Sequence, residues 1–434
     1  MSPIEIGYAG LAAFALLLAL RCPIGIAMAL VGLFGGIAVN GWPTTLFVLG
    51  ALPFESVFPY GLSIVPLFVL MGTLAHPAGV SRAIYDAGEG GFGHRRGGLA
   101  MGGIAACAGF GAICGSSLAT AATMARISIP EMRARGYDPA FAAATVAAGG
   151  TLGVLIPPSL VLVIYALLTQ ESVGKLFVAA FIPGLVAAAL YLGAITVVTA
   201  RHPHLAPALP RRPGAERLRM VLSAWDVIAL FVAVLGGLFL GLFSPTEAAS
   251  VGVAGVVALG LARRRFSRRA FLDALQEAAG LTGMIFFILI GAALFNYFIE
   301  ATRVTDLFVA AVHGADLSYW QVVAAIILLY LVLGCFMDSI SMVFLTLPFL
   351  YPIVQSYGMD PIWFGILMLS VVEVGLITPP VGMNLFIVSA SAPDVGFGRL
   401  CRAVVPFILA DSLRIVLVAA FPALSLWLAN LLFT

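Results

Sequence analysis

The sequence predicts an all-α integral membrane protein made of two inverted-topology repeats, and three observations lead to this fold class. Of its 434 residues, 62% are hydrophobic and 10% are charged, and the mean hydropathy is +1.10. A soluble domain carries about 25% charged residues, so this composition excludes one. Several apolar runs are long enough to cross a bilayer. Finally, Pro157-Pro158 and Pro379-Pro380 interrupt two such runs, 222 positions apart.

The same offset of 222 positions recurs along the chain. The matched pairs are Pro23 with Pro245, Ser117 with Ser339, Pro130 with Pro352, Asp138 with Asp360, and Gly153 with Gly375. These residue types fix the shape of the backbone, whereas a shared apolar composition alone would match Leu and Ala. We infer that residues 1–200 form the first repeat and residues 223–434 the second. A linker rich in Arg and Pro joins them over residues 201–222.

In the first repeat, the apolar runs and their interruptions predict a definite order of elements. Residues 44–58 are too interrupted by prolines to assign, and a glycine-rich basic loop is expected over residues 88–98. The remaining elements are spans at about 4–20, 24–40 and 60–78, a re-entrant hairpin at about 98–125, a broken span at about 139–168, and a span at about 176–200.

The second repeat is expected to follow the same plan. Its elements are spans at about 225–243 and 246–262, a basic loop from Arg263 to Arg269, a span at about 281–299, a hairpin at about 320–355, a broken span at about 362–390, and a last span at about 403–431. Each repeat would then hold five spans and one hairpin. An odd number of spans inverts the second repeat relative to the first.

The basic residues indicate the same inversion independently. Arg95 and Arg96 precede the first hairpin, and Arg126, Arg133 and Arg135 follow it. Cytoplasmic loops carry an excess of Lys and Arg, so the first hairpin is expected to enter from the cytoplasmic side. No Lys or Arg lies between residues 303 and 399, which places the second hairpin on the opposite side. Both chain termini would lie on that opposite, periplasmic side.

The paired breaks predict a binding site at the middle of the membrane. A Pro-Pro pair lacks two amide donors, and the carbonyls that it frees must face protein or a water-filled cavity. Interrupted helices at matching places of two repeats indicate the binding site of a secondary transporter. Five hydroxyls could complete an oxygen cage suited to Na⁺: Ser116, Ser117, Thr151, Ser339 and Thr378. The alternative, favoured for isolated G-x-x-x-G patterns such as Gly111…Gly115, is that small residues let helices pack closely.

Two carboxylates belong to the second repeat only. Asp338 lies beside the second hairpin tip, and Glu373 lies just before Gly375, whereas their counterparts Ser116 and Thr151 are neutral. An ionisable group inside a bilayer indicates function by default, with a structural hydrogen bond as the alternative. We therefore expect the two cation sites to differ in strength.

Other functional classes lack support in the sequence. The five cysteines form no C-x-x-C pair and the five histidines do not cluster, so no transition metal or disulfide framework is expected. Neither H-E-x-x-H nor G-x-x-x-x-G-K-[ST] occurs, so we expect no catalytic centre, no ATP hydrolysis and no organic cofactor. A net charge of +2 indicates no nucleic-acid partner. The N-terminus lacks the basic region of a cleaved signal peptide. A passive channel and a membrane-embedded enzyme remain alternatives.

Four motifs carry a resemblance to a known family. They are Gly115-Ser116-Ser117, the G-x-L-I-P-P break, Ser244-Pro245-Thr246-Glu247, and the segment from Ile377 to Asn384. Together they closely resemble the large membrane subunit of TRAP (tripartite ATP-independent periplasmic) transporters. The resemblance implies an elevator-type, ion transporter superfamily-like permease of the bacterial inner membrane, which imports an organic acid with Na⁺. The acid would be a C4-dicarboxylate, a sialic acid or a similar carboxylate. The implied partners are a small four-span membrane subunit and a periplasmic substrate-binding protein.

The resemblance also implies site residues at matching positions. The first cation would be surrounded by Ser116, Ser117, Thr151, Gly153 and Pro157, and the second by Asp338, Ser339, Gly375, Thr378 and Met383. The substrate would lie between the two hairpin tips, in the vicinity of Gly115, Pro158, Pro379, Pro380 and Asn384. A stand-alone Na⁺-coupled carboxylate transporter of the same superfamily, which needs no partner proteins, is the competing hypothesis.

Overall fold

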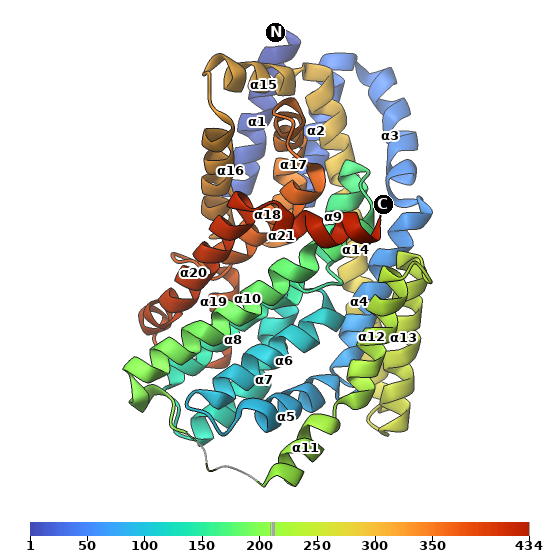
Figure 1. Cartoon of the computed structure of the whole chain (residues 1–434). Coiled ribbons are helices and arrows are strands. Elements are labelled where there is room, and N and C mark those ends of the chain that lie inside the picture. The colour runs from blue at the N-terminus through green and yellow to red at the C-terminus, as the bar shows by residue number, and fades with distance from the viewer. Residues whose placement is uncertain (209, 211–212, 434) are drawn as a thin grey trace. The chain divides into compact units, whose positions relative to one another are not determined.

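The computed structural model describes residues 1–208, 210 and 213–433, and every regular element in this part of the chain is a helix (Figure 1). Residues 209, 211 and 212 of the predicted linker lie outside the described residues. Six helices are long and apolar enough to cross a membrane, or up to eight if each of two bent helix pairs counts as one span. The all-α membrane fold expected from the composition is therefore confirmed.

The chain divides into two units. The first comprises residues 1–63, 279–326 and 340–361, and the second comprises residues 64–278, 327–339 and everything from residue 362 onward. Every residue that the sequence assigned to the cation and substrate sites belongs to the second unit. The site can therefore be described within one unit.

The first unit is built on glycines that let helices approach closely. Its elements are α1 (Pro3–Ala19), α2 (Ile24–Asn40), α3 (Trp42–Val57), η1 (Tyr60–Ser63), the larger part of α14 (Arg268–Thr302), α15 (Val304–Gly314), the start of α16 (Tyr319–Gly334), and most of α17 (Ser339–Ser356). A Cβ on Gly32 would overlap the backbone of Leu294, and the rings of Phe14 and Phe295 lie 5.1 Å apart. Apolar helices of 17 residues each occupy the predicted spans at 4–20 and 24–40, and the unassigned segment 44–58 is helical with Pro53 inside it.

The second unit contains the first hairpin and both broken spans. Its elements are α4 (Ile64–Ala75), α5 (Val80–Phe92), α6 (Gly98–Cys114), α7 (Ser117–Ala134), α8 (Pro139–Leu155), α9 (Leu160–Thr169), α10 (Val173–Arg201), η2 (Pro203–Leu205), α11 (Gly214–Leu222), α12 (Trp225–Phe239), α13 (Pro245–Ala262), α18 (Pro361–Gly375), α19 (Met383–Ser391), α20 (Phe397–Ala420) and α21 (Ala423–Leu432). Figure 1 shows α5, α6, α8 and α10 side by side, and α6 contacts α5, α7 and α8.

The repeat is visible in the order and spacing of these helices. The hairpin α6–α7 matches α16–α17, the broken pair α8–α9 matches α18–α19, and α10 matches α20. The second helix of each hairpin begins at a serine: α7 begins at Ser117 and α17 at Ser339, at the predicted offset of 222 positions. The broken spans begin at Pro139 and Pro361, again at that offset. The serine and proline pairs at this offset therefore mark helices that begin at equivalent positions in the two halves.

Several predicted boundaries are wrong. The expected glycine loop at 88–98 is shorter than predicted, because α5 continues to Phe92 and α6 begins at Gly98, which leaves residues 93–97 as the loop. Gly88 lies in α5, where a Cβ would overlap the carbonyl of Gly102 on α6. The glycines there serve close packing of α5 on α6. The last predicted span, 403–431, is two helices that separate at Phe421-Pro422.

Two further helices extend beyond their predicted limits. Helix α7 runs to Ala134, past the expected hairpin limit near residue 125. Helix α14 starts at Arg268, inside the predicted basic loop, and α15 and the linker helix α11 were not expected. Charged residues shorten an apolar run without ending a helix, because Arg and Glu are good helix formers.

Candidate cation and substrate site

The first hairpin tip is a two-residue turn between α6 and α7. Gly115 adopts φ +66°, a left-handed conformation that favours glycine, and ends α6. Ser116 then caps α7, because its hydroxyl accepts a hydrogen bond from the amide of Ala119 at 3.4 Å. One tight backbone turn and a serine hydroxyl therefore lie at this end of the hairpin.

The first tip is bonded directly to the first break. The amide of Leu160 donates to the carbonyl of Gly115 at 3.3 Å, and a Cβ on Gly115 would lie 3.0 Å from the carbonyl oxygen of Pro158. A Cβ on Gly111 would overlap the backbone of Gly153, which lies one turn before the break. For Gly111 and Gly153 the packing role that we favoured for isolated glycine patterns is thus confirmed.

The second break repeats these contacts with different residues. Helix α18 ends at Gly375, and α19 begins after Gly382, whose φ of +60° again favours glycine. The amide of Gly382 donates to the carbonyl of Cys335 at 3.1 Å. A Cβ on Gly375 would overlap the backbone of Gly334, the last residue of α16. Both breaks are therefore attached to the adjoining hairpin through backbone atoms.

Glu373 is the one carboxylate at the centre of this arrangement that is fully buried. Its side chain is 0% exposed, and its Oε1 accepts a hydrogen bond from the Ser339 hydroxyl at 2.9 Å. The corresponding positions in the first repeat hold Ser117 and Thr151. The predicted asymmetry between the halves therefore lies at a buried contact, where charge matters most.

Asn384 connects the second break with the first repeat. Its side-chain amide donates to the carbonyl of Ala147 on α8 at 3.3 Å, and α19 packs against both α7 and α8. A Cβ on Gly150 would lie 3.1 Å from the Asn384 amide nitrogen and 3.2 Å from the carbonyl oxygen of Ser117. The predicted substrate residue Asn384 and the first-site residue Ser117 are thus brought together.

Three buried oxygens in this region have no hydrogen-bond partner. By strict hydrogen-bond geometry they are Thr120 Oγ1, Glu373 Oε2 and Asn384 Oδ1, and the Ser117 hydroxyl lies near the Glu373 carboxyl. Thr120 Oγ1 lies beside Gly153, where an added Cβ would overlap it. A buried oxygen that accepts nothing is costly, and a hydroxyl, a carboxylate and an amide carbonyl are ligands that hard cations accept. The chemistry of these three oxygens therefore suits a hard cation such as Na⁺.

The two threonines assigned to the cation sites hold different positions. Thr151 is fully buried and its hydroxyl lies 2.7 Å from the carbonyl of Ala148 and 2.9 Å from the Tyr191 hydroxyl, on the side of α10. Thr378 is partly buried and donates to the carbonyl of Val374 at 2.7 Å. Its hydroxyl keeps two lone pairs for another contact, whereas the Thr151 hydroxyl is engaged on both sides.

The other assigned residues surround this centre at different depths. Pro157 and Pro158 are buried, and both Pro-Pro peptide bonds are cis. Four further assigned residues are partly exposed: Asp338, Pro379, Met383 and, more fully, Pro380. The second break is therefore more open to its surroundings than the first.

A buried ion pair behind the first break was missed in the sequence. The Arg414 Nε donates to Asp411 Oδ1 at 2.6 Å, and both side chains are 0% exposed. The Tyr191 hydroxyl donates to the other Asp411 oxygen at 2.6 Å and also contacts Thr151. Arg414 further donates to the carbonyl of Ser370 on α18 at 3.1 Å. This chain of bonds joins α8, α10, α20 and α18, and two charges inside an apolar span were the signal available for finding it.

Ion pairs also join the two repeats where α7 ends. Arg133 donates to both carboxylate oxygens of Asp394, at 2.9 and 2.6 Å, and these hydrogen bonds lower the pKa of Asp394. Arg399 donates to Asp138 at 3.0 Å. Asp138 also caps α8, because its side chain accepts a hydrogen bond from the amide of Ala140 at 2.9 Å.

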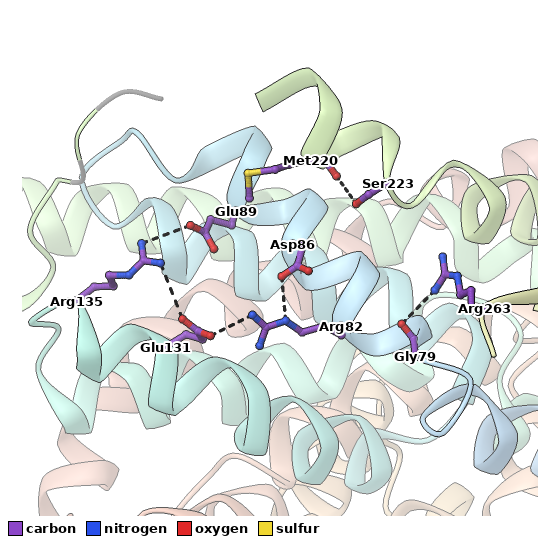
Figure 2. A network of polar contacts seen from close by, with 9 residues as sticks. All are labelled: Gly79, Arg82, Asp86, Glu89, Glu131, Arg135, Met220, Ser223 and Arg263. Atoms are coloured by element: carbon purple, nitrogen blue, oxygen red, sulfur yellow. Dashed lines mark hydrogen bonds and ion pairs between the residues drawn. The ribbon is translucent and has the colours of Figure 1, made fainter. Parts of the chain in front are cut away.

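A second charged network lies between α5 and α7 (Figure 2). Glu131 bridges two arginines: it lies 3.1 Å from Arg82 and 4.0 Å from Arg135. Arg82 also contacts Asp86 at 3.1 Å, and Arg135 contacts Glu89 at 3.4 Å. A cavity of about 420 Å³ lies among these side chains. The network braces the return helix of the first hairpin against α5.

The fold and the site together define a class of protein. Multiple apolar helices, a structural repeat, and two helix breaks that meet buried oxygens are the features of a multi-pass secondary transporter. Comparison with known proteins identifies the family. The family model described as "Tripartite ATP-independent periplasmic transporter, DctM component" matches residues 11–424.

Relatives with assigned names agree with that match. The C4-dicarboxylate TRAP transporter large permease protein DctM of Pseudomonas aeruginosa is 37% identical over 89% of this chain and 90% of its own length. The sialic acid TRAP transporter large permease protein SiaM of Vibrio cholerae is 31% identical over 86% of this chain and 87% of its own. The isethionate TRAP transporter permease protein DctMQ of Oleidesulfovibrio alaskensis is 32% identical, and the match covers 99% of this chain and 66% of that protein.

A solved structure supports the fold alone. The Alcanivorax borkumensis YdaH transporter, whose crystal structure is described as having an unusual topology, matches with a TM-score of 0.67 and 16% identity, over 92% of this chain and 98% of that one. The chain belongs to the DctM component family of tripartite ATP-independent periplasmic transporters. It is therefore a transporter permease component and not an enzyme.

Proposed function

We propose that this chain is the permease subunit of a Na⁺-coupled secondary transporter that imports an organic acid. The observation that supports this proposal best is the group of buried, unpartnered oxygens of Thr120, Glu373 and Asn384, beside the first tip and the two helix breaks. In secondary transporters, unwound carbonyls at broken helices coordinate Na⁺ and the N-termini of half-helices face anionic substrate groups. The two helix breaks and the half-helices beside them are the parts of this chain that would serve both tasks.

The proposed cation sites keep the assigned residues. Ser116, Ser117, Gly153 and Pro157 would surround the first ion, with Thr151 contributing through its main chain because its hydroxyl is engaged by Tyr191. Asp338, Ser339, Gly375, Thr378 and Met383 would surround the second. Glu373, ionised beside a bound cation, would add a buried negative charge next to Ser339. A carboxylate strengthens cation binding, so we propose that the second site binds Na⁺ more tightly.

The proposed substrate position lies beside the start of α19, near Gly115, Pro158, Pro379, Pro380 and Asn384. The N-terminus of α19 has no side-chain cap. The amide of Asn384 in its first turn already donates to the carbonyl of Leu376 at 3.0 Å, so the other end of this turn would face an anionic group. The helix dipole favours a negative charge there. The names of the three relatives specify a C4-dicarboxylate, a sialic acid and isethionate, all of them organic acids. An organic acid is therefore the substrate class that we propose.

We propose the partners and the location from the family. A periplasmic binding protein would deliver the substrate, and a small four-span membrane subunit would accompany this chain in the bacterial inner membrane. Both termini would be periplasmic, in keeping with the arginine pattern. The hairpin tips and broken spans would move together as an elevator, carrying the site between the two faces of the membrane.

Uptake into proteoliposomes tests the tripartite, Na⁺-coupled part. The purified permease with its small subunit is expected to accumulate substrate only with an inward Na⁺ gradient and the added binding protein. Full uptake without the binding protein would contradict the tripartite mechanism and favour the stand-alone transporter. Equal uptake with K⁺ in place of Na⁺ would contradict the proposal that Na⁺ is the coupling ion. Thermal-shift screening of the cognate binding protein identifies the acid to use.

Thr378→Val tests one side chain of the second cation site. The two side chains have nearly the same shape, but valine cannot contribute an oxygen ligand. We expect a higher Na⁺ concentration for half-maximal uptake at unchanged expression. The matched control is Thr196→Val on α10, where the hydroxyl donates to the carbonyl of Leu192 at 2.8 Å, far along the chain from either break. An unchanged Na⁺ dependence for Thr378→Val would show that the Thr378 hydroxyl does not bind the cation.

A further inference from the structure

A surface groove between α10 and α20 has the shape and chemistry of an amphiphile site. The cavity has a volume of about 730 Å³, within the range of about 300–1,000 Å³ typical of small-molecule sites. Its walls are apolar, with Leu190 and Val197 on α10 and Leu409 and Leu413 on α20. Val197, Leu409 and Leu413 are about half or more exposed, so nothing in the described chain covers them.

One end of the groove carries positive charge without a partner. Arg201, the last residue of α10, and Arg402, in the second turn of α20, both line it. Neither guanidinium makes a hydrogen bond or ion pair with any residue that the structure describes, and both residues are exposed. Asp138, the carboxylate in the lining, is already engaged by Arg399 and by the α8 amides. The end of the groove that holds Arg201 and Arg402 can therefore bind an anion.

The length of the groove matches one leaflet of a bilayer. From Arg201 to Leu190, and from Arg402 to Leu413, each wall extends about 16 Å at about 1.5 Å per residue. The hydrocarbon core of a bilayer is about 30 Å thick, so half of it is about 15 Å. A ligand with its charge at the arginines would thus place its apolar part across a single leaflet. A membrane-spanning helix is longer, about 30 Å.

Gly193 keeps the middle of the groove open. A Cβ built on this residue has no heavy atom within 4 Å, so the glycine does not serve the packing of α10 on another described helix. A glycine inside a helix costs about 1 kcal/mol relative to alanine. An open position of this kind inside a long helix is explained if something outside the chain fills it.

We propose that this groove binds an anionic phospholipid of the cytoplasmic leaflet. The phosphate lies between Arg201 and Arg402, and an acyl chain lies over Gly193 between Val197 and Leu409. Basic pockets between membrane helices on the cytoplasmic side bind the headgroups of anionic lipids. The bound lipid braces α10 against α20, the two helices that carry Tyr191 and the buried Asp411–Arg414 pair.

Lipid binding to the purified protein tests the proposal. We expect the protein in detergent to retain dioleoylphosphatidylglycerol in native mass spectrometry and to unfold at a higher temperature with it. Dioleoylphosphatidylcholine, which has no net charge, should do neither. Glycerol 3-phosphate, which carries the anion without acyl chains, should not displace the lipid at equal concentration. Equal binding of both lipids, or displacement by glycerol 3-phosphate, would overturn the proposal.

Two variants locate the site. Each guanidinium beside an anionic lipid contributes a factor of about five, so Arg201→Ala with Arg402→Ala should weaken phosphatidylglycerol binding about 25-fold. Both side chains are exposed and unpaired, so this variant keeps the fold. Gly193→Phe fills the groove and should abolish binding. Gly283→Phe is the matched control, because Gly283 also has open space and lies outside the groove.

The same variants distinguish a protein partner from a lipid. If a helix of another subunit fills the groove, Gly193→Phe should release that subunit during purification and leave lipid binding unchanged. That result would overturn the proposal, as would unchanged lipid affinity in the double arginine variant. Loss of lipid with the subunit retained is the expected result. None of these measurements depends on transport, so they stand apart from the proposed uptake function.

Discussion

Replacing Arg414 by methionine should destabilise the second unit strongly. The Arg414 Nε lies 2.6 Å from Asp411 Oδ1, and neither side chain is exposed. At an effective dielectric constant of about 20, this separation corresponds to an attraction of about 6 kcal/mol. Burial of the two charges costs several kcal/mol each, so the net contribution of the intact pair is small. Removing one partner is different, because the other charge stays buried.

The expected magnitude follows from what each variant leaves behind. Arg414→Met leaves Asp411 with the Tyr191 hydroxyl, and a buried charge without its partner costs about 3–5 kcal/mol. Adding Asp411→Leu removes the second charge and takes one acceptor from the Tyr191 hydroxyl, which still contacts the Thr151 hydroxyl, so this loss costs at most about 1–3 kcal/mol. The double variant should therefore be more stable than the single variant, by about 2 kcal/mol.

Equilibrium unfolding in mixed micelles of detergent and dodecyl sulfate, followed by tryptophan fluorescence, measures these differences. Arg399→Met is the control on the same helix, because its pair with Asp138 is exposed and such pairs contribute about 0–1 kcal/mol. An Arg414→Met variant within about 1 kcal/mol of the wild type would show that Asp411 does not remain as an uncompensated buried charge. A double variant less stable than Arg414→Met alone would show the same.

Three further variants test the site and its support. Glu373→Gln keeps an acceptor for Ser339 but removes the charge, so we expect about tenfold more Na⁺ for half-maximal uptake; an unchanged Na⁺ dependence would contradict it. Gly153→Val should cost about 1–3 kcal/mol by overpacking the first break, measured as a lower unfolding temperature, whereas Gly283→Val, with open space around it, should cost less. Asp394→Asn should lower the unfolding temperature near neutral pH. The folded pKa of Asp394 is lowered, so its contribution is present above the ordinary carboxyl pKa of about 3.9 and is lost as the pH falls through the folded value. The difference from the wild type should shrink on acidification, and a difference that is constant with pH would contradict the pairing.

Prolines in this chain show how far sequence reasoning reaches. The breaks at Pro157-Pro158 and Pro379-Pro380 were predictable, because two adjacent prolines remove two donors of the helical ladder. A single proline in the sequence did not predict whether the helix ends at that position. Pro183 and Pro406 lie inside the continuous helices α10 and α20, whereas Pro422 follows the end of α20. One missing hydrogen bond can be tolerated in a helix that packs well, and the sequence does not reveal the packing.

The site was predictable in its backbone and less so in its side chains. The repeat offset placed Ser339 and Glu373 opposite Ser117 and Thr151, and the structure joins the first two by a hydrogen bond. The engagement of Thr151 by Tyr191 was not predictable, because a sequence does not show which face of α8 meets α10. Whether the assigned residues hold Na⁺ and substrate stays a prediction.

Both breaks are attached to their hairpins by main-chain atoms, through Leu160 and Gly115 in one half and Gly382 and Cys335 in the other. Main-chain bonds do not depend on which side chains a residue carries. Each half can therefore change its side chains without losing this attachment. Thr151 and Glu373 occupy equivalent places and differ in side-chain chemistry, so point substitutions alone can make the two halves chemically different on the same backbone.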